Sequence, residues 1–484
     1  MVKKSGVFWI IFLVLAVFLL SVCSKKKSTE PEPTTDKWTI LGYFDGNNGL
    51  DVDTLISSGD TLPYSYVILD VQEMEQVGST ENVQIIIMVS SITTEGNCNY
   101  YFIEKHLDEP PLDSIRSEVL DSLGKKDMSD PQTLRDFIEY GVAHYPADHY
   151  MLIINDRGSG WKGVCSDQEN GDGEMMTLPE LSSALFGYNF EIILFNAPFM
   201  SMVEVAHQLK DKANYLIALQ FDLPIKDMLS SSEWLQSLAN NPGISSRNLA
   251  RNITEIIHTI VLANPEIATA SMSAIDLSKV DALTSKIADF GSVLVTHTGD
   301  HWKEVLDARE FLSYIPSYYF DLKRFSQNIY SSNDLDSTIQ SAAQAVENAT
   351  EVTVVKRWSK PDLGYGGLSI HFPFDSETFD STDYVQLAFA VSNWHIFLSE
   401  FIQAYAEVNS GSLWIISHPV KGASIFLDGE YTGFETDAII HGILAGYHMV
   451  KLVKEGYTDR DQLVWVDAGD TTVWNIPFGY EGPP

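Results

Sequence analysis

The sequence predicts an α/β protein, with a mostly parallel sheet flanked by helices and followed by a small C-terminal all-β module. The first part alternates apolar runs with amphipathic helical segments, an order typical of parallel sheets covered on both faces. Past Gly411 the pattern changes to short alternating strands separated by turns. We therefore expect two folded parts, residues 37–406 and residues 411–478.

Apolar runs in the first part predict buried strands, because strands covered on both faces are apolar along their whole length. These runs are residues 38–44, 83–89, 151–154, 192–195 and 215–218. Two later runs, residues 352–355 and 367–371, also have strand character.

Helical periodicity separates these runs. Residues 131–145 carry apolar side chains on one face, and Asp130 followed by Pro131 is a typical helix start. Further helices are expected at residues 200–212, through most of residues 230–349, and at residues 384–405.

Short strands with alternating polarity predict the C-terminal module. Asp428 and Gly429 form a hairpin signal, because both residue types tolerate positive φ. The expected strands are residues 412–418, 423–428, 447–453, 462–466 and 471–476.

Length and charge limit the classes of function. A chain of 484 residues can form two or more domains, and 45% hydrophobic residues exclude wholesale disorder. The formal net charge is −35. Such a charge repels nucleic acid and anionic lipid surfaces, so we expect neither as a partner.

The N-terminus predicts a targeting region. Lys3 and Lys4 precede an apolar run at residues 6–22, whose 17 residues are near the lower limit for a membrane span. We expect residues 1–22 to be a signal peptide or N-terminal anchor. Residues 23–36, rich in Lys, Ser, Thr, Glu and Pro, are expected to form a flexible tether.

Residues 20–23, Leu-Ser-Val-Cys, resemble the lipobox of bacterial lipoproteins, which implies lipidation of Cys23. Val22 departs from that pattern, since a small residue is usual before the cysteine. An uncleaved anchor is the alternative. Both predict an exported protein of the bacterial cell envelope, tethered to a membrane and facing the periplasm or the surface.

Two strand ends carry the most informative motifs. Asn-Asp-Arg-Gly-Ser-Gly-Trp occupies residues 155–161, and Phe-Asn-Ala-Pro-Phe-Met occupies residues 195–200. The carboxyl ends of parallel strands meet at one edge of a sheet, where α/β proteins bind ligands. The residues of a groove at this edge would be Asp156, Arg157, Gly158, Ser159 and Asn196; the sequence leaves open whether that groove is open or filled in.

At these motifs the chain resembles the clostripain family of cysteine peptidases, which have a caspase-like fold. In that family the first strand end typically reads Trp-Asp-His-Gly-x-Gly-Trp and the second Phe-Asp-Ala-Cys-x-Met. The resemblance extends over residues 37–406, with further matching segments at residues 38–51, 73–78, 127–146, 178–181 and 366–373. It implies a caspase-like sheet in this chain.

The resemblance also implies positions for catalytic groups, and here the chain departs from the family. Arg157 stands where the family has its catalytic histidine, and Pro198 where it has its nucleophilic cysteine. Asn196 replaces an aspartate linked to basic substrates, and Leu219 replaces a serine. A Cys–His peptidase needs a thiolate and an imidazole, so we predict a pseudopeptidase.

The alternative is an active cysteine peptidase of the family that cleaves after basic residues. Cys165 lies in a loop soon after Arg157, and His207 follows Pro198, but their joint relocation to hydrogen-bond distance would be a coincidence. We expect His207 to be a packed or half-exposed residue of a helix. Ser159 has no evident histidine partner.

The acidic loop of residues 167–174 invites a calcium reading, because oxygen ligands are dense there. Its spacing fails the EF-hand pattern, so a solvated loop is the stronger prediction and calcium the alternative. No other cofactor or metal site is expected. Cys98 and Cys165 form a disulfide or stay free; the sequence leaves both open.

The C-terminal module resembles a PEGA domain, through residues 419–434, Leu-Ala-Gly-Tyr at 444–447 and Lys-Glu-Gly-Tyr-Thr at 454–458. Such modules are small β-sandwiches on exported bacterial proteins. The sequence as a whole predicts a binding or scaffolding protein of the cell envelope, with a peptide or protein as its ligand.

Overall fold

The computed structural model describes residues 36–47, 52–57, 60–91, 95–108, 114–167, 171, 173–221, 229–265, 267–309, 318–373 and 379–478; the side chains of residues 52–64, 407 and 408 are not described. The predicted signal peptide or anchor, Cys23 and nearly all of the tether lie outside these residues. Among the helices that the structure describes, none has the length and apolar character needed to cross a membrane.

A nine-stranded sheet forms the centre of the first part, in the described residues, in the order β12-β10-β9-β8-β7-β1-β4-β5-β6. The strands are β1 (Trp38–Gly46), β4 (Val83–Ser91), β5 (Asn97–Phe102), β6 (Glu118–Lys125), β7 (His149–Asn155), β8 (Phe190–Asn196), β9 (Ala213–Ala218), β10 (Ala270–Asp276) and β12 (Val354–Lys360). Strands β4, β1, β7, β8 and β9 are parallel, and the outer strands pair antiparallel. The predicted mostly parallel sheet is confirmed.

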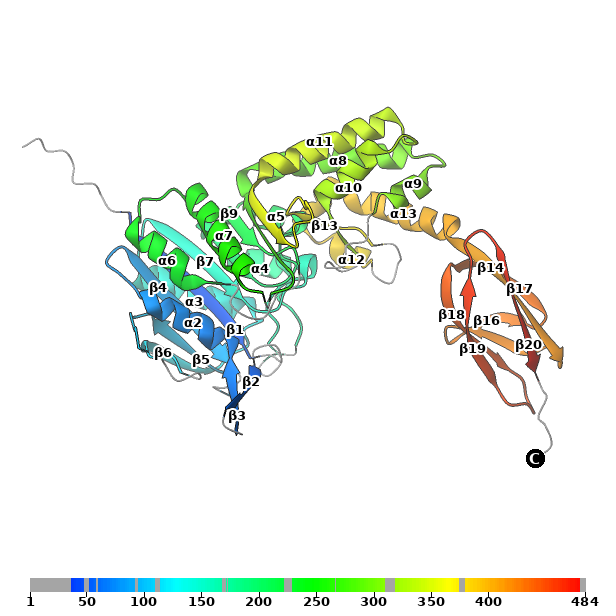
Figure 1. Ribbon diagram of the computed structural model, residues 1–484, viewed down its shortest axis with the longest axis horizontal. Coiled ribbons are helices and arrows are strands. Elements are labelled where there is room, and N and C mark those ends of the chain that lie inside the picture. Colours follow the sequence, from blue (N-terminus) through cyan, green and yellow to red (C-terminus); the bar gives the residue numbers. More distant parts are fainter. Residues whose placement is uncertain are drawn as a thin grey trace, which may run out of the picture. The chain divides into compact units, whose positions relative to one another are not determined.

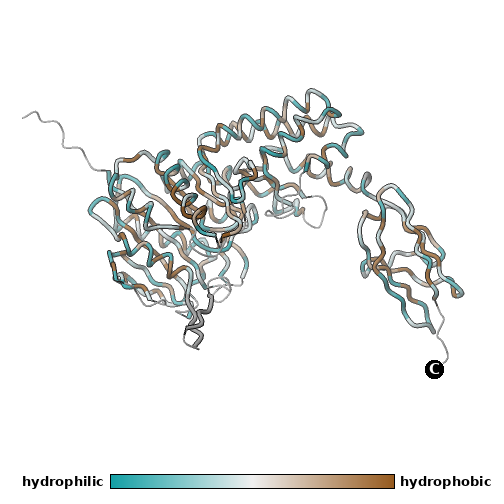
Figure 2. Tube along the Cα trace, in the orientation of Figure 1, coloured by the Kyte–Doolittle hydropathy of each residue, from teal (hydrophilic) through white to brown (hydrophobic). Residues whose placement is uncertain are grey.

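The parallel strands form because nearly all their residues are apolar and buried on both faces. Every residue of β1 is buried, and β4, β7 and β8 are buried apart from one or two residues each. Figure 2 shows hydrophobic residues along these central strands. All five strands predicted from apolar runs are confirmed, each with slightly different ends.

Helices cover the two faces of the sheet and enclose two apolar clusters. One cluster takes side chains from α2 (Tyr66–Val77), α6 (Ser231–Asn240) and α7 (Ser246–Ala263). The other takes side chains from α3 (Pro131–His144), α4 (Leu178–Ala184), α5 (Val203–Leu209), α8 (Val280–His297), α10 (Leu322–Ser331), α11 (Ser337–Thr353) and α13 (Trp394–Val408). Helices α8, α10 and α11 lie side by side (Figure 1). The predicted start of α3 is confirmed, since Asp130 accepts a hydrogen bond from Gln132 N.

Three helix predictions need correction. The helix expected at residues 200–212 is shorter, because residues 200–202 lie outside it and α5 spans only Val203–Leu209. Residues 230–349 contain strand β10 and the short strand β11 (Tyr319–Asp321) among the helices. The helix expected at 384–405 is interrupted: α12 (Ser381–Tyr384) ends, and α13 starts only after Asn393, whose φ is 54°.

The smaller elements complete this part. Helix α9 (Trp302–Asp307) and the short helical turns Gly160–Lys162, Leu277–Lys279 and Ala388–Ser392 connect the larger elements. Strand β2 (Val52–Ser57) pairs with β3 (Asp60–Ser65), and β11 pairs with β13 (Ser369–His371).

The C-terminal part consists of two small sheets around one apolar core, as predicted. One sheet has the order β17-β14-β20 and the other β16-β15-β18-β19. The strands are β14 (Ser410–Pro419), β15 (Ser424–Leu427), β16 (Glu430–Glu435), β17 (Ala438–Leu444), β18 (Gly446–Val453), β19 (Arg460–Val466) and β20 (Thr471–Phe478). Asp428 and Gly429 have φ of 52° and 94°, as the predicted hairpin turn requires.

Candidate functional site

The predicted site lies at the carboxyl edge of the parallel strands. In the register of β7 and β8, Asn155 is the direct neighbour of Asn196. Asn196 Nδ2 donates to Asn155 Oδ1 at 3.2 Å, and Asn155 Nδ2 donates to Asp70 Oδ2 of α2 at 2.6 Å. Asn196 is only 4% exposed, and this amide chain fixes the two strand ends to each other and to the helix behind them.

The loops that leave these strands meet at Gly158 and Pro198. A Cβ atom on Gly158 would lie 2.4 Å from the Pro198 carbonyl oxygen, closer than real Cβ atoms approach. Glycine is therefore required for this contact. The structure thus brings together the two positions where the resemblance implies a histidine and a cysteine, because Arg157 adjoins Gly158 in the chain.

Arg157 is half-buried at this edge. In the described residues its guanidinium makes no ion pair, and its buried Nε has no hydrogen-bond partner. A buried donor without a partner costs free energy. The side chain therefore has unused capacity to donate hydrogen bonds to an anionic group.

Buried carboxyl groups lie next to Arg157. Burial raises the pKa of Asp156, and burial together with the Asp156 and Asp167 carboxyls raises the pKa of Asp45 at the end of β1. Because a hydrogen bond between the Asp45 and Asp156 side chains contributes to these shifts, we expect the pair to share a proton. Asp45 is not among the residues predicted from the sequence, although it lies at the carboxyl end of a parallel strand, next to the edge where Asp156 follows β7.

Asp167 anchors the loop beyond Arg157. Its carboxylate oxygens accept from Asn47 Nδ2 at 2.9 Å and from Met128 N at 3.2 Å, and the side chain is fully buried. Across the ranges that the structure describes, no group of three or more His, Cys, Asp or Glu residues is arranged to hold a metal ion. Calcium binding by residues 167–174 stays a prediction, since part of that loop lies outside the described residues.

The two cysteines in the described part are free thiols, and both are fully buried. Burial raises the pKa of Cys98 to about 11, and burial with the Asp156 and Asp45 carboxyls raises the pKa of Cys165 well above its usual value. Reactive cysteines need the opposite environment, one that favours the thiolate. No hydrogen bond between a cysteine and a histidine occurs in the described residues.

His207 is packed on α5, as expected, with 5% of its surface exposed. Its Nε2 lies 3.5 Å from Asp281 Oδ1 of α8, and burial lowers its pKa. Leu219 is fully buried just after β9, and its carbonyl oxygen accepts from Ser201 N at 2.8 Å. Neither side chain reaches a thiol.

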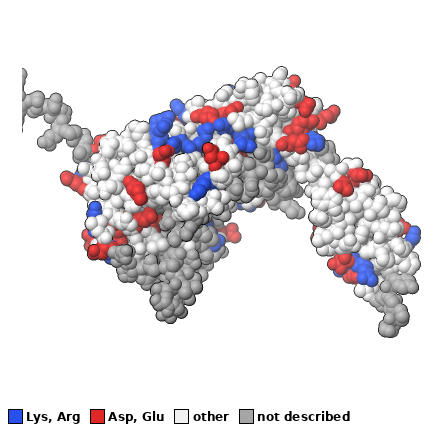
Figure 3. All heavy atoms as spheres, viewed as in Figure 1, with Lys and Arg blue, Asp and Glu red and all other residues white. Residues whose placement is uncertain are grey.

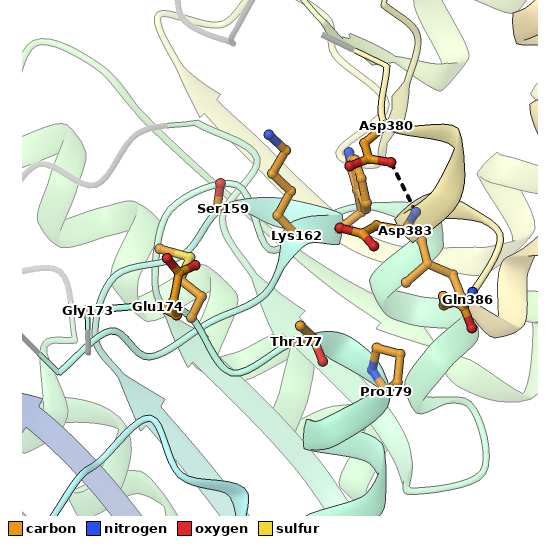
Figure 4. A pocket seen from close by; sticks show the side chains of 12 residues that line it. Ser159, Lys162, Gly173, Glu174, Thr177, Pro179, Asp380, Asp383 and Gln386 are labelled. Carbon is orange, nitrogen blue, oxygen red and sulfur yellow. Dashed lines mark hydrogen bonds between the residues drawn. The ribbon is translucent and has the colours of Figure 1, made fainter. Parts of the chain in front are cut away.

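A pocket of about 600 Å³ opens beside the Gly-Ser-Gly turn. Figure 4 shows Glu174 on one side of the space and Asp380 and Asp383 on the other, with Lys162 between them. Ser159 lines this pocket, as predicted for a groove. Asp156 and Asn196 are buried instead, at 7% and 4% exposure, so the open space lies on the side of Ser159.

The family model for the clostripain family matches residues 56–436. The chain belongs to the clostripain family. A second model, for the PEGA domain, matches residues 410–479. Clostripain from Hathewaya histolytica is 30% identical to this chain over 95 residues, which are 17% of this chain and 18% of that protein's own length.

Solved structures of clostripain-family proteins share the fold. A secreted C11 cysteine protease from Bacteroides thetaiotaomicron, in complex with an irreversible peptide inhibitor, has a TM-score of 0.56 at 19% identity, covering 74% of this chain and 99% of that one. An inactive zymogen C11 protease from Parabacteroides distasonis has a TM-score of 0.55 at 20% identity, covering 75% of this chain and 99% of that one. At these identities the likeness establishes the fold alone.

The close approach of Gly158 to Pro198 predicts the effect of adding one methyl group. Gly158→Ala forces the two loops apart, so we expect the free energy of unfolding to fall by about 1–3 kcal/mol. Urea unfolding followed by tryptophan fluorescence measures it. The control is Gly291→Ala in α8, where the new Cβ meets ordinary contacts of 3.4 Å or more and helix propensity improves. An equal free energy of unfolding for Gly158→Ala and wild type would contradict the close approach of Gly158 to the Pro198 carbonyl oxygen.

The shared proton predicts how stability depends on pH. Because the folded-state pKa values of Asp45 and Asp156 are raised, their contribution to stability is full below the unfolded value of about 4 and is lost as the pH rises. In Asp45→Asn the amide can donate to Asp156 without that proton. We expect its Tm to fall less than that of wild type as the pH rises from about 4 to about 8.

The matched control for this pH profile is Asp121→Asn on the exposed strand β6. Its Tm should follow the wild-type profile. An Asp45→Asn profile that also follows wild type would show that the two carboxyls do not share a proton.

Proposed function

We propose that this clostripain-family chain is a pseudopeptidase that binds a peptide or protein of the bacterial cell envelope without cleaving it. The observation that carries the proposal is the juxtaposition of Arg157 and Pro198 at the carboxyl edge of the sheet. By resemblance, these positions belong to the family's histidine and cysteine.

The chemistry of these two residues supports binding over hydrolysis. Proline offers no nucleophile, and an arginine stays protonated near neutral pH, so it cannot act as a general base. The buried thiols of Cys98 and Cys165 are disfavoured as thiolates, because burial raises the pKa of each. Neither is hydrogen-bonded to an imidazole in the residues that the structure describes.

The ligand we propose for the strand edge carries a carboxylate. The Arg157 guanidinium has no ion-pair partner in the described part of the chain, and a carboxylate can accept two of its hydrogen bonds. Asn196 supports this choice, since an amide stands where the family has an aspartate linked to basic substrates. A basic ligand would meet Arg157 with like charge.

We also propose that the protein is exported and tethered to a membrane. The PEGA domain and the secreted family member among its structural relatives support export. The tether would be a lipid on Cys23 or an uncleaved anchor at residues 1–22, and the PEGA domain would contact other envelope components.

The competing function is an active cysteine peptidase that cleaves after basic residues. Family membership favours it, and so does one contact: the backbone N–H of Cys165 donates to the Arg157 carbonyl at 3.1 Å, so a thiol lies near the predicted site. Activity would require that buried thiol to become exposed and to find a base.

One assay separates the two functions. A soluble chain starting at Ser28 is incubated with arginyl and lysyl peptide substrates, with and without a thiol alkylator. We expect no turnover above background in either condition. Turnover that the alkylator abolishes would replace the proposed function with the peptidase.

The binding role of Arg157 has its own test. Arg157→Ala removes the free guanidinium, so we expect weaker binding of the envelope ligand, measured by its co-purification with the full-length protein. The control is Arg135→Ala, which removes the same charge from an arginine that pairs with Glu139 on α3. Unchanged ligand recovery with Arg157→Ala would contradict the role.

A further inference from the structure

A second pocket, of about 540 Å³, lies beyond the end of β9, at the antiparallel side of the sheet. It falls in the size range of small-ligand sites. Its walls come from β12, α7, α10 and the loop before β13. The residues that matter here are Gln220, Lys323, Arg357, Trp358, Lys360 and Tyr365.

This pocket is basic in a strongly acidic protein. Lys323 Nζ and Arg357 Nη2 both lie 2.7 Å from Glu351 Oε1, so two cations share one carboxylate. Lys360 Nζ donates to two carbonyl oxygens at the C-terminal end of α7, and within the described ranges it forms no ion pair. Three cations and one carboxylate, that of Asp362, line the pocket, and the carboxylates of Glu351 and Asp321 lie next to it, while the whole chain carries −35.

Figure 3 shows Lys and Arg side chains gathered on the visible face near β12, with Asp and Glu side chains among them. A concave basic surface on an acidic protein attracts anionic groups, because charges at the walls of a cleft focus the field within it.

The side-chain amide of Gln220 is buried in the pocket, and its hydrogen bonding is incomplete. Gln220 is 2% exposed, and its Nε2 donates to Asp321 Oδ2 at 2.7 Å. Asp321 Oδ2 also accepts from Gly366 N at 2.8 Å, which holds it in place. Gln220 Oε1 has no hydrogen-bond partner among the residues that the structure describes. A buried acceptor of this kind needs a donor, and a ligand N–H in the pocket would supply one.

The pocket walls carry aromatic side chains, which suit a peptide ligand. Trp358 and Tyr365 are at most 7% exposed, and His258 stacks on Trp358 with ring centroids 5.0 Å apart. The wall residue Gly367 also accepts a hydrogen bond from Ser201, shortly after Pro198, at 2.7 Å. The pocket therefore adjoins the loop of the predicted site and is separate from Arg157.

We propose that this pocket binds a peptide carboxylate, with Lys323, Arg357 and Lys360 attracting the charge and Gln220 Oε1 accepting from the neighbouring peptide N–H. The carboxylate belongs to an acidic side chain or to a peptide C-terminus, which share this chemistry. The inference goes beyond the proposed function, since it does not require Arg157 to bind anything.

The test uses the full chain in detergent micelles and isothermal titration calorimetry with three peptides. They are acetyl-Ala-Glu-Ala-Glu-Ala-amide, the same peptide with Gln for Glu, and acetyl-pentaalanine with a free carboxylate. We expect the Glu peptide or the free-carboxylate peptide to bind at least about tenfold more tightly than the Gln peptide. Added salt should weaken that binding.

Two variants locate the binding. Arg357→Gln should weaken it by at least about tenfold, because it removes a charged hydrogen-bond donor. Lys356→Gln is the control: the preceding residue on β12 has the same charge, points to the opposite face and pairs with Glu255. It should change affinity by less than about twofold. Near-ultraviolet circular dichroism checks that both variants are folded.

Several results would overturn the inference. One is that neither carboxylate peptide binds better than the Gln peptide at concentrations up to about 5 mM. Another is equal weakening by Lys356→Gln and Arg357→Gln. Binding that survives Arg357→Gln but is lost with Arg157→Ala would place the peptide at the strand edge, which would support the proposed function and contradict this inference.

Discussion

The parallel pairing of β7 with β8 is the constraint on which the rest of the site depends. It makes Asn155 and Asn196 direct neighbours, so the loops that follow them must leave the sheet at the same edge. The contact of Gly158 with the Pro198 carbonyl then follows from chain direction and from the absence of a side chain. Any residue placed at position 157 or 198 is held at this edge by the sheet itself.

In the proposed function, this scaffold holds groups that bind a peptide without cleaving it. Behind the edge, burial raises the pKa values of Asp45 and Asp156, and the Cys165 thiol lies against them where a thiolate is disfavoured. In front of it, Arg157 has one buried donor, Nε, without a hydrogen-bond partner among the described residues. The central sheet has the fold of the clostripain family, while Arg157 and Pro198 at its edge differ from the residues that the resemblance implies. This combination agrees with family membership and with the proposed loss of peptide hydrolysis.

How much the sequence predicts depends on burial. Strands buried on both faces, such as β1, are apolar throughout and could be predicted, whereas β6 has no buried residue in its eight positions and gives no such signal. Strand β10 lies within residues 230–349, where helices were predicted. Its sequence, Ala-Ser-Met-Ser-Ala-Ile-Asp, is mostly small and polar and therefore gives no apolar run. Arg157 and Pro198 were found through motif order. The pocket around Gln220 could not be predicted from the sequence, because its lining residues come from elements far apart in the chain.

The central claim, that no reactive thiol is paired with a base in this fold, has one direct measurement. The folded protein is incubated with a peptidyl-arginine chloromethyl ketone, which alkylates an activated active-site thiol, and its intact mass is then recorded. The account predicts an unchanged mass, because the described thiols are buried and neither is hydrogen-bonded to an imidazole in the described residues. A stoichiometric adduct on Cys98 or Cys165 at native pH would contradict it.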